Sequence, residues 1–182
     1  MKETEPYEKR MALMLAAALV IASIAGCTAA DKQPSGQDDG DTSVAQVAVD
    51  EDLANIIKDA SEIGEGTAGV SLKRAKVAHD VAVLAANRGY ANGSVEELKQ
   101  TFEATVEAMD EDHQTNVDAT FMNGVIPLLD KAIDEGDYDS VKGQFEDADV
   151  TDDMDTILQA PGLKESYDSI KSAYLTMGNS ED

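Results

Sequence analysis

Residues 94–109, SVEELKQTFEATVEAM, contain the pattern that decides the fold. Their apolar side chains recur every three or four positions, which is the spacing of one face of an α-helix. Ser94 followed three residues later by Glu97 is the pair that forms a capping box at a helix start. We therefore predict an amphipathic helix that begins here. Its apolar stripe consists of Val95, Leu98, Phe102, Val106 and Met109.

The same spacing continues on both sides of this segment. Further stripes begin at Leu53, Val70, Val117 and Leu163, and shorter ones cover residues 141–145 and 151–158. Glycine or proline separates most of them, and no alternating run is long enough for a strand. We predict that residues 47–182 form an acidic, all-α domain, a helical bundle of four to five main helices. Pro127 lies within the fourth stripe, where its missing N–H should kink or divide the helix.

The chain before this domain divides into two further parts. Residues 31–46, DKQPSGQDDGDTSVAQ, are polar and contain almost nothing that could be buried. Such composition does not offset the entropy lost on ordering, so we expect residues 27–46 to form a flexible tether. Residues 1–26 end in an uncharged run of sixteen residues, 11–26, that follows the basic pair Lys9-Arg10. This is the organisation of a secretory signal peptide, and the run is short for a membrane-spanning helix.

The last residues of that run, Ile24-Ala25-Gly26-Cys27, resemble the lipobox of bacterial lipoproteins. The resemblance implies that a diacylglyceryl group is attached to the sulfur of Cys27, with fatty acids such as palmitate as the membrane anchor. It also implies that signal peptidase cleaves between Gly26 and Cys27. The mature chain would then be held on the extracytoplasmic face of the cell membrane. The resemblance covers the targeting segment alone. Cys27 is the single cysteine of the chain, so no disulfide is expected.

The charge of the chain excludes some classes of partner. It has 37 acidic and 14 basic residues, and three of each lie before Cys27, which leaves 34 acidic and 11 basic residues after the predicted cleavage. Nucleic acids and anionic lipid surfaces require clustered lysine and arginine, so we expect no nucleic-acid binding. The excess of carboxylates fits either solubility at a crowded surface or binding of cations or of a basic partner.

No catalytic set, cofactor motif or metal motif emerges from the sequence. The acidic stretch from Asp110 has Thr115 where an EF-hand loop needs glycine and Phe121 where it needs the closing acid. The stretch from Asp147 also lacks the glycine of an EF-hand loop, and Leu158 stands where the closing acid belongs. His79 lies on the alanine-rich side of the second helix and is expected to be packed there, with Asp80 directed elsewhere. His113 and Asp110 would hold a metal only loosely.

These observations favour a membrane-anchored, non-catalytic interaction module over an enzyme. We expect no catalytic residue, no metal and no cofactor. The predicted partners are the membrane, through the lipid on Cys27, and another protein of the cell envelope. A helical lipoprotein that binds a small ligand or a cation is the alternative hypothesis.

Overall fold

The computed structural model describes residues 49–151 and 153–178, and all regular structure within these ranges is helical. The prediction of an all-α helical bundle is confirmed. The predicted signal peptide (1–26), Cys27 and the tether to residue 46 lie outside the described residues. The helices are α2 (Glu51–Ser61), α3 (Val70–Arg88), α4 (Val95–Glu107), α5 (Glu111–Thr120), α6 (Ile126–Leu129), α7 (Lys142–Asp147), α8 (Met154–Ile157) and α9 (Leu163–Thr176).

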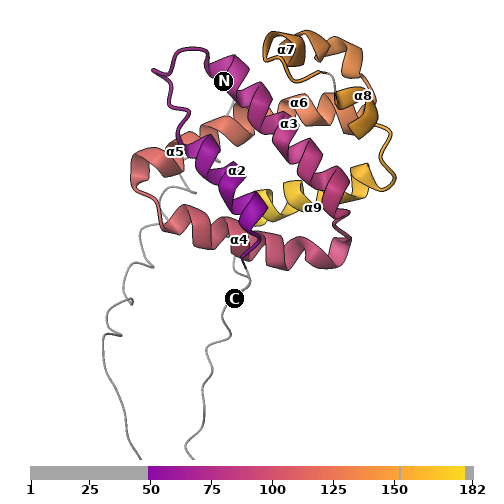
Figure 1. Cartoon of the computed structure of the whole chain (residues 1–182). Helices are drawn as coiled ribbons and strands as arrows, with labels where there is room; N and C mark the ends of the chain where they lie inside the picture. Colours follow the sequence, from indigo (N-terminus) through magenta and orange to yellow (C-terminus); the bar gives the residue numbers. More distant parts are fainter. Residues whose placement is uncertain (1–48, 152, 179–182) are drawn as a thin grey trace, which may run out of the picture. The chain divides into compact units, whose positions relative to one another are not determined.

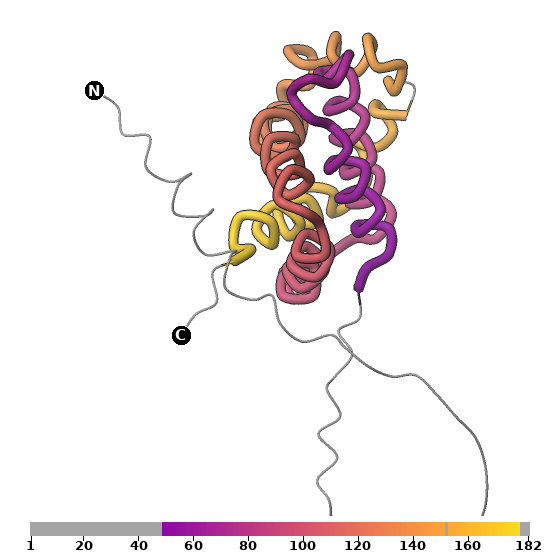
Figure 2. Tube along the Cα trace, turned by 90° about the vertical axis from the view of Figure 1, so that its left-hand side faces the viewer, coloured from indigo at the N-terminus to yellow at the C-terminus, as the bar shows by residue number. Residues whose placement is uncertain are grey.

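Helix α3 is the centre of the domain. It packs against α2, α6, α7, α8 and α9 (Figure 1). Alanines on its buried side allow these neighbours to approach closely, and each has no exposed surface. They are Ala75, Ala78, Ala82 and Ala85. Helices α2 and α3 run in opposite directions, so α3 begins at the end of the domain that lies opposite the start of α2 (Figures 1 and 2).

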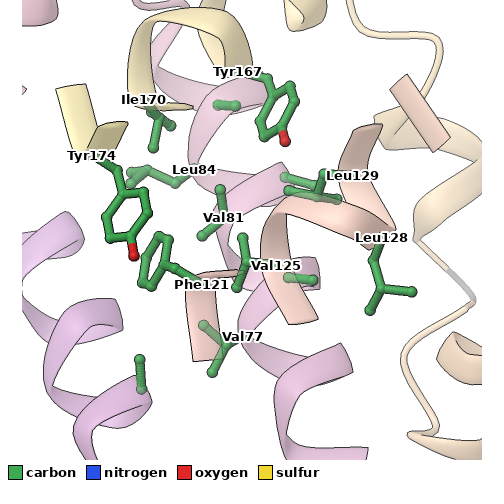
Figure 3. Close-up of a cluster of buried hydrophobic side chains, with 14 of the residues drawn as sticks. Val77, Val81, Leu84, Phe121, Val125, Leu128, Leu129, Tyr167, Ile170 and Tyr174 are labelled. Atoms are coloured by element: carbon green, nitrogen blue, oxygen red, sulfur yellow. The ribbon is translucent and has the colours of Figure 1, made fainter. Parts of the chain in front are cut away.

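The core forms where α9 and the middle of the α5–α6 region meet α3 (Figure 3). Phe121 meets Phe102 edge-on at 5.4 Å between ring centroids and stacks on Tyr174 at 4.8 Å. Phe102 and Tyr174 are 5.6 Å apart, so each ring contacts the other two. Since the rings come from α4, from the turn after α5 and from α9, this cluster joins three segments that are distant in sequence.

Pro127 does interrupt the α-helical pattern, but the chain remains helical around it. A single π turn, η3 (Phe121–Val125), follows α5 directly, and the short α6 contains the proline at its start. The N–H of Ile126 donates to the carbonyl of Phe121, five residues back. A second π turn, η4 (Asp130–Asp134), ends the run. The wider turns accommodate a residue without an N–H, and the helical stretch around Pro127 is divided into α5, η3, α6 and η4.

The predicted capping box at Ser94 is wrong. A 3₁₀ turn, η2 (Asn92–Ser94), precedes α4, and Ser94 already has helical dihedral angles, φ −85° and ψ −7°. An N-cap residue needs extended dihedral angles to aim its side chain at the N–H groups of the first turn. The side chain of Ser94 accordingly makes no capping hydrogen bond.

The start of α2 is fixed firmly to the rest of the domain. Asp50 caps the helix by accepting from the N–H groups of Asp52 and Leu53. Its other carboxylate oxygen accepts from the Tyr90 hydroxyl at 2.6 Å, and its N–H donates to the Thr101 hydroxyl at 3.1 Å. The point at which residues 1–48 join the domain is therefore held against the loop after α3 and against α4.

Gly124 is required where η3 crosses α3. A Cβ added there would lie 2.7 Å from the Cβ of Arg74 and 3.0 Å from its Cγ, closer than such atoms can approach. We expect Gly124→Ala to lower the free energy of unfolding by about 1–3 kcal/mol, because the two helices must separate.

Gly143→Ala in α7 is the matched control, since its Cβ would meet nothing within 4 Å. That change gains helix propensity, about 1 kcal/mol at most, and should stabilise slightly. Urea denaturation of both variants measures the two effects. Stabilisation by both substitutions would contradict the close approach of η3 to Arg74.

Candidate functional site

The densest cluster of charged side chains joins α9 to η4. Lys171 Nζ lies 2.5 Å from Asp130 and 3.1 Å from Asp134. Lys164 Nζ lies 2.6 Å from Asp134, and the Tyr167 hydroxyl donates to Asp130 at 2.8 Å. The π turn η4 places Asp130 and Asp134 on the side that meets α9. Each lysine thus has two or more carboxylate oxygens within reach, counting Asp168 beside Lys164 at 3.0 Å.

The protonation of this cluster indicates a structural role. Burial of the Tyr167 hydroxyl, together with its hydrogen bond to Asp130, raises the pKa of this tyrosine far above its usual value. Burial would raise the pKa of Asp134, but its hydrogen bonds to Lys164 and Lys171 outweigh burial and lower it. Tyr167 therefore stays protonated and Asp134 stays ionised near neutral pH. The cluster therefore holds α9 against η4 through ion pairs and a tyrosine hydrogen bond.

An open groove of about 420 Å³ lies beside this cluster. It runs between η4 with the segment after it and the first turn of α9, and its walls are about equally polar and apolar. The lining residues are Ala132, Ile133, Gly136, Tyr138, Leu158, Ala160, Gly162, Leu163, Lys164 and Glu165. Its volume is within the range of small-molecule sites, roughly 300–1,000 Å³. The one lysine that lines it, Lys164, is already paired with Asp134 and Asp168.

A different kind of surface lies on the first turns of α3. Leu72, Lys73 and Lys76 are exposed, and Arg74 is partly exposed. We call these four residues the basic surface of α3. Leu72 has 40% of its surface exposed, which is unusual for a large apolar side chain of this domain. None of the three cations forms an ion pair with a residue that the structure describes.

Arg74 is the most constrained member of the basic surface of α3. Its stem lies over Gly124, and its Nε is buried without a hydrogen-bond acceptor among the described residues. The predictions from sequence did not include this surface. The signal was present, because Lys73, Arg74 and Lys76 are the densest basic run after Cys27. The sequence alone could not show that these cations remain unpaired, because ion pairing depends on tertiary structure.

The structure separates the two histidines. His79 is largely buried, as expected, with 13% of its side chain exposed. The prediction that Asp80 is directed elsewhere is wrong, because its carboxylate lies 3.2 Å from Nδ1 of His79. His113 Nδ1 lies 2.7 Å from Asp110, which also caps α5, and His113 Nε2 lies 3.6 Å from Glu62. No group of three or more metal-ligating side chains with the geometry of a metal site occurs within residues 49–151 and 153–178.

His113 gives the domain a pH-dependent contact. Its hydrogen bond to Asp110, and then the negative charges around it, raise the pKa of His113 above the usual 6.5. The contact therefore stabilises α5 fully below pH 6.5, and this contribution is lost as pH rises through the folded-state pKa.

Asp110→Asn keeps the helix cap but removes the charge, so the pKa of His113 should fall toward 6.5. Asp112→Asn removes the same charge from the same turn without touching the imidazole, and should change the pKa much less. Titration of the His113 ring signals by NMR measures both variants. Equal shifts would show that general charge, and not the 2.7 Å contact, sets the pKa.

Comparisons with known proteins identify no relative of this chain. No protein-family model, curated protein or solved structure matches this chain. In the part of the chain that the structure describes, no helix has the length and apolar character needed to cross a bilayer. The predicted cleavage and lipidation residues, Gly26 and Cys27, lie outside that part.

Proposed function

We propose that this protein is a membrane-anchored lipoprotein whose helical domain binds another protein of the cell envelope, without catalysing a reaction. The anchor rests on the signal peptide and on the lipobox Ile24-Ala25-Gly26-Cys27. The observation that supports binding is the basic surface of α3, where an exposed leucine lies beside three cations without an ionic partner among the described residues. A single exposed leucine is common on protein surfaces, so the support comes from its place beside three neighbouring cations on one helix.

The position of this surface suits a tethered protein. Residues 1–48 join the domain at the start of α2, and the basic surface of α3 lies at the opposite end (Figures 1 and 2). Helix α3 has 19 residues and is therefore about 28 Å long. The point where residues 1–48 join the domain is therefore separated from the basic surface of α3 by about the length of this helix.

Site-specific photocrosslinking in cells tests this proposal. A photoreactive amino acid replaces Leu72 in the full-length, lipidated protein, and the membranes are extracted after irradiation. The matched control places the same amino acid at Asn87, which is exposed on the same helix about four turns away. We expect one reproducible protein adduct from position 72 and none from position 87. Absence of any adduct at position 72 would contradict the proposal.

A second candidate function is binding of a small ligand in the groove beside η4. The volume of about 420 Å³ favours it, because it is within the range of small-molecule sites. Thermal melting of the soluble domain with a panel of metabolites and divalent cations tests this candidate, because a ligand that binds the folded state raises the melting temperature. Ile133→Arg would obstruct the groove and should abolish any such shift.

A further inference from the structure

We infer that the partner presents an acidic segment with an apolar side chain to the basic surface of α3. This inference rests on the proposed function and gives the partner a chemistry. Three cations without an ion pair to the described residues stand together on one helix of an acidic chain. The other basic residues of the domain mostly find carboxylates, as Arg88 does with Asp52 and Lys131 with Glu135.

Lys76 does not form an ion pair with the nearest acidic residue of its own helix, Asp80. Asp80 lies four residues later on the same helix, a spacing that allows an ion pair. Its carboxylate instead contacts His79 at 3.2 Å. The order lysine before aspartate is also the weaker one for such pairs. Lys73 has Val77 at the corresponding position, so the helix offers it no partner. Both ammonium groups are exposed and remain available to an incoming carboxylate.

Arg74 contributes a guanidinium group whose side chain is already held in position. Its stem is fixed where it crosses Gly124, so little side-chain freedom remains to be lost when the guanidinium binds. Arg74 is partly exposed, so its guanidinium can meet a partner although its Nε is buried without an acceptor among the described residues. Carboxylates match the planar donors of arginine, and this complementarity favours Asp or Glu on the partner.

Leu72 supplies the apolar part of the contact. It lies four residues before Lys76, so the two side chains are neighbours on the helix surface. A partner segment that pairs with Lys76 would cover the exposed leucine at the same time. Burying it removes apolar surface from water and adds to the binding energy. The recognised element is thus an acidic segment with at least one apolar side chain.

The charge of the whole chain favours a compact acidic segment over an extended anionic surface. The net charge is −23, so a bilayer or a nucleic acid would be repelled by the rest of the molecule. Salt screens charges beyond about 10 Å at 0.1 M ionic strength. A short segment therefore experiences mainly the three nearby cations, whereas a broad anionic surface also faces the acidic flanks.

The test combines the Leu72 crosslinker with charge reversal in the full-length, lipidated protein. Lys76→Glu alters the basic surface of α3. Lys58→Glu is the matched control, because Lys58 is exposed on α2 and also lacks an ionic partner among the described residues. Each variant changes the net charge equally. We expect Lys76→Glu to reduce the adduct about tenfold, a loss of about 1.4 kcal/mol of binding energy, and Lys58→Glu to leave it unchanged.

Peptide mapping of the adduct completes the test. The crosslinked segment of the partner should carry an excess of Asp and Glu. Lys76→Gln, which removes the charge without reversing it, should give an intermediate yield and guards against misfolding of Lys76→Glu. A protein adduct on a neutral or basic segment, insensitive to Lys76→Glu, would overturn the inference and leave the proposed function intact. An adduct with lipid or with a second copy of this chain would also overturn it.

Discussion

Replacing Cys27 by alanine is expected to leave the whole chain uncut and without a lipid. In the lipoprotein pathway that the lipobox implies, the Cys27 thiolate forms a thioether to the diacylglyceryl group of a lipid donor, whose headgroup is displaced and leaves, and cleavage before the modified residue follows. Alanine has no nucleophile, so both steps should stop. The residues involved are Gly26 and Cys27, and the chain has no other cysteine that could replace Cys27. The variant should accumulate as the precursor, longer by 26 residues than the processed protein.

Metabolic labelling with a clickable fatty acid and an immunoblot measure the two steps separately. Thr28→Ala is the matched control, because it changes the neighbouring residue and leaves the thiol and the preceding small residues intact. It should be labelled and cut as the wild type is. Normal processing of Cys27→Ala would refute the lipid anchor.

The fold was largely predictable because its helices obey local rules. The stripes that begin at Leu53, Val70 and Leu163 correspond to α2, α3 and α9 within a few residues. Their apolar faces are buried, since helical spacing alone decides which side chains share a face. The capping box failed at Ser94 because a preceding 3₁₀ turn changes its dihedral angles, and that turn has no strong local signature.

The candidate site was less predictable because it depends on contacts between distant segments. The pairing of Lys171 with Asp130 spans 41 residues, and it needs the π turn η4 to direct the aspartate toward α9. The unpaired state of Lys73 and Lys76 is likewise a property of the folded chain. Sequence shows a basic run, but only the structure shows that its neighbours leave it exposed.

Phe121→Ala is expected to lower the free energy of unfolding by about 3–5 kcal/mol. Phe121 is 1% exposed, and its ring contacts both Phe102 and Tyr174. Alanine would leave a cavity at the point where α4, η3 and α9 meet, and two aromatic contacts would be lost with it. A domain of this size is usually stable by only about 5–15 kcal/mol, so much of the stability would be lost. The melting temperature should fall by roughly 10 °C or more.

Met122→Ala is the matched control for this substitution. Met122 is the next residue of the same π turn and is 47% exposed, so its truncation should change stability by less than about 0.5 kcal/mol. Thermal denaturation followed by circular dichroism compares the two variants. Phe121 is buried and Met122 is exposed, because neighbouring residues of a helix point to different sides. Similar losses in both variants would contradict this difference in burial.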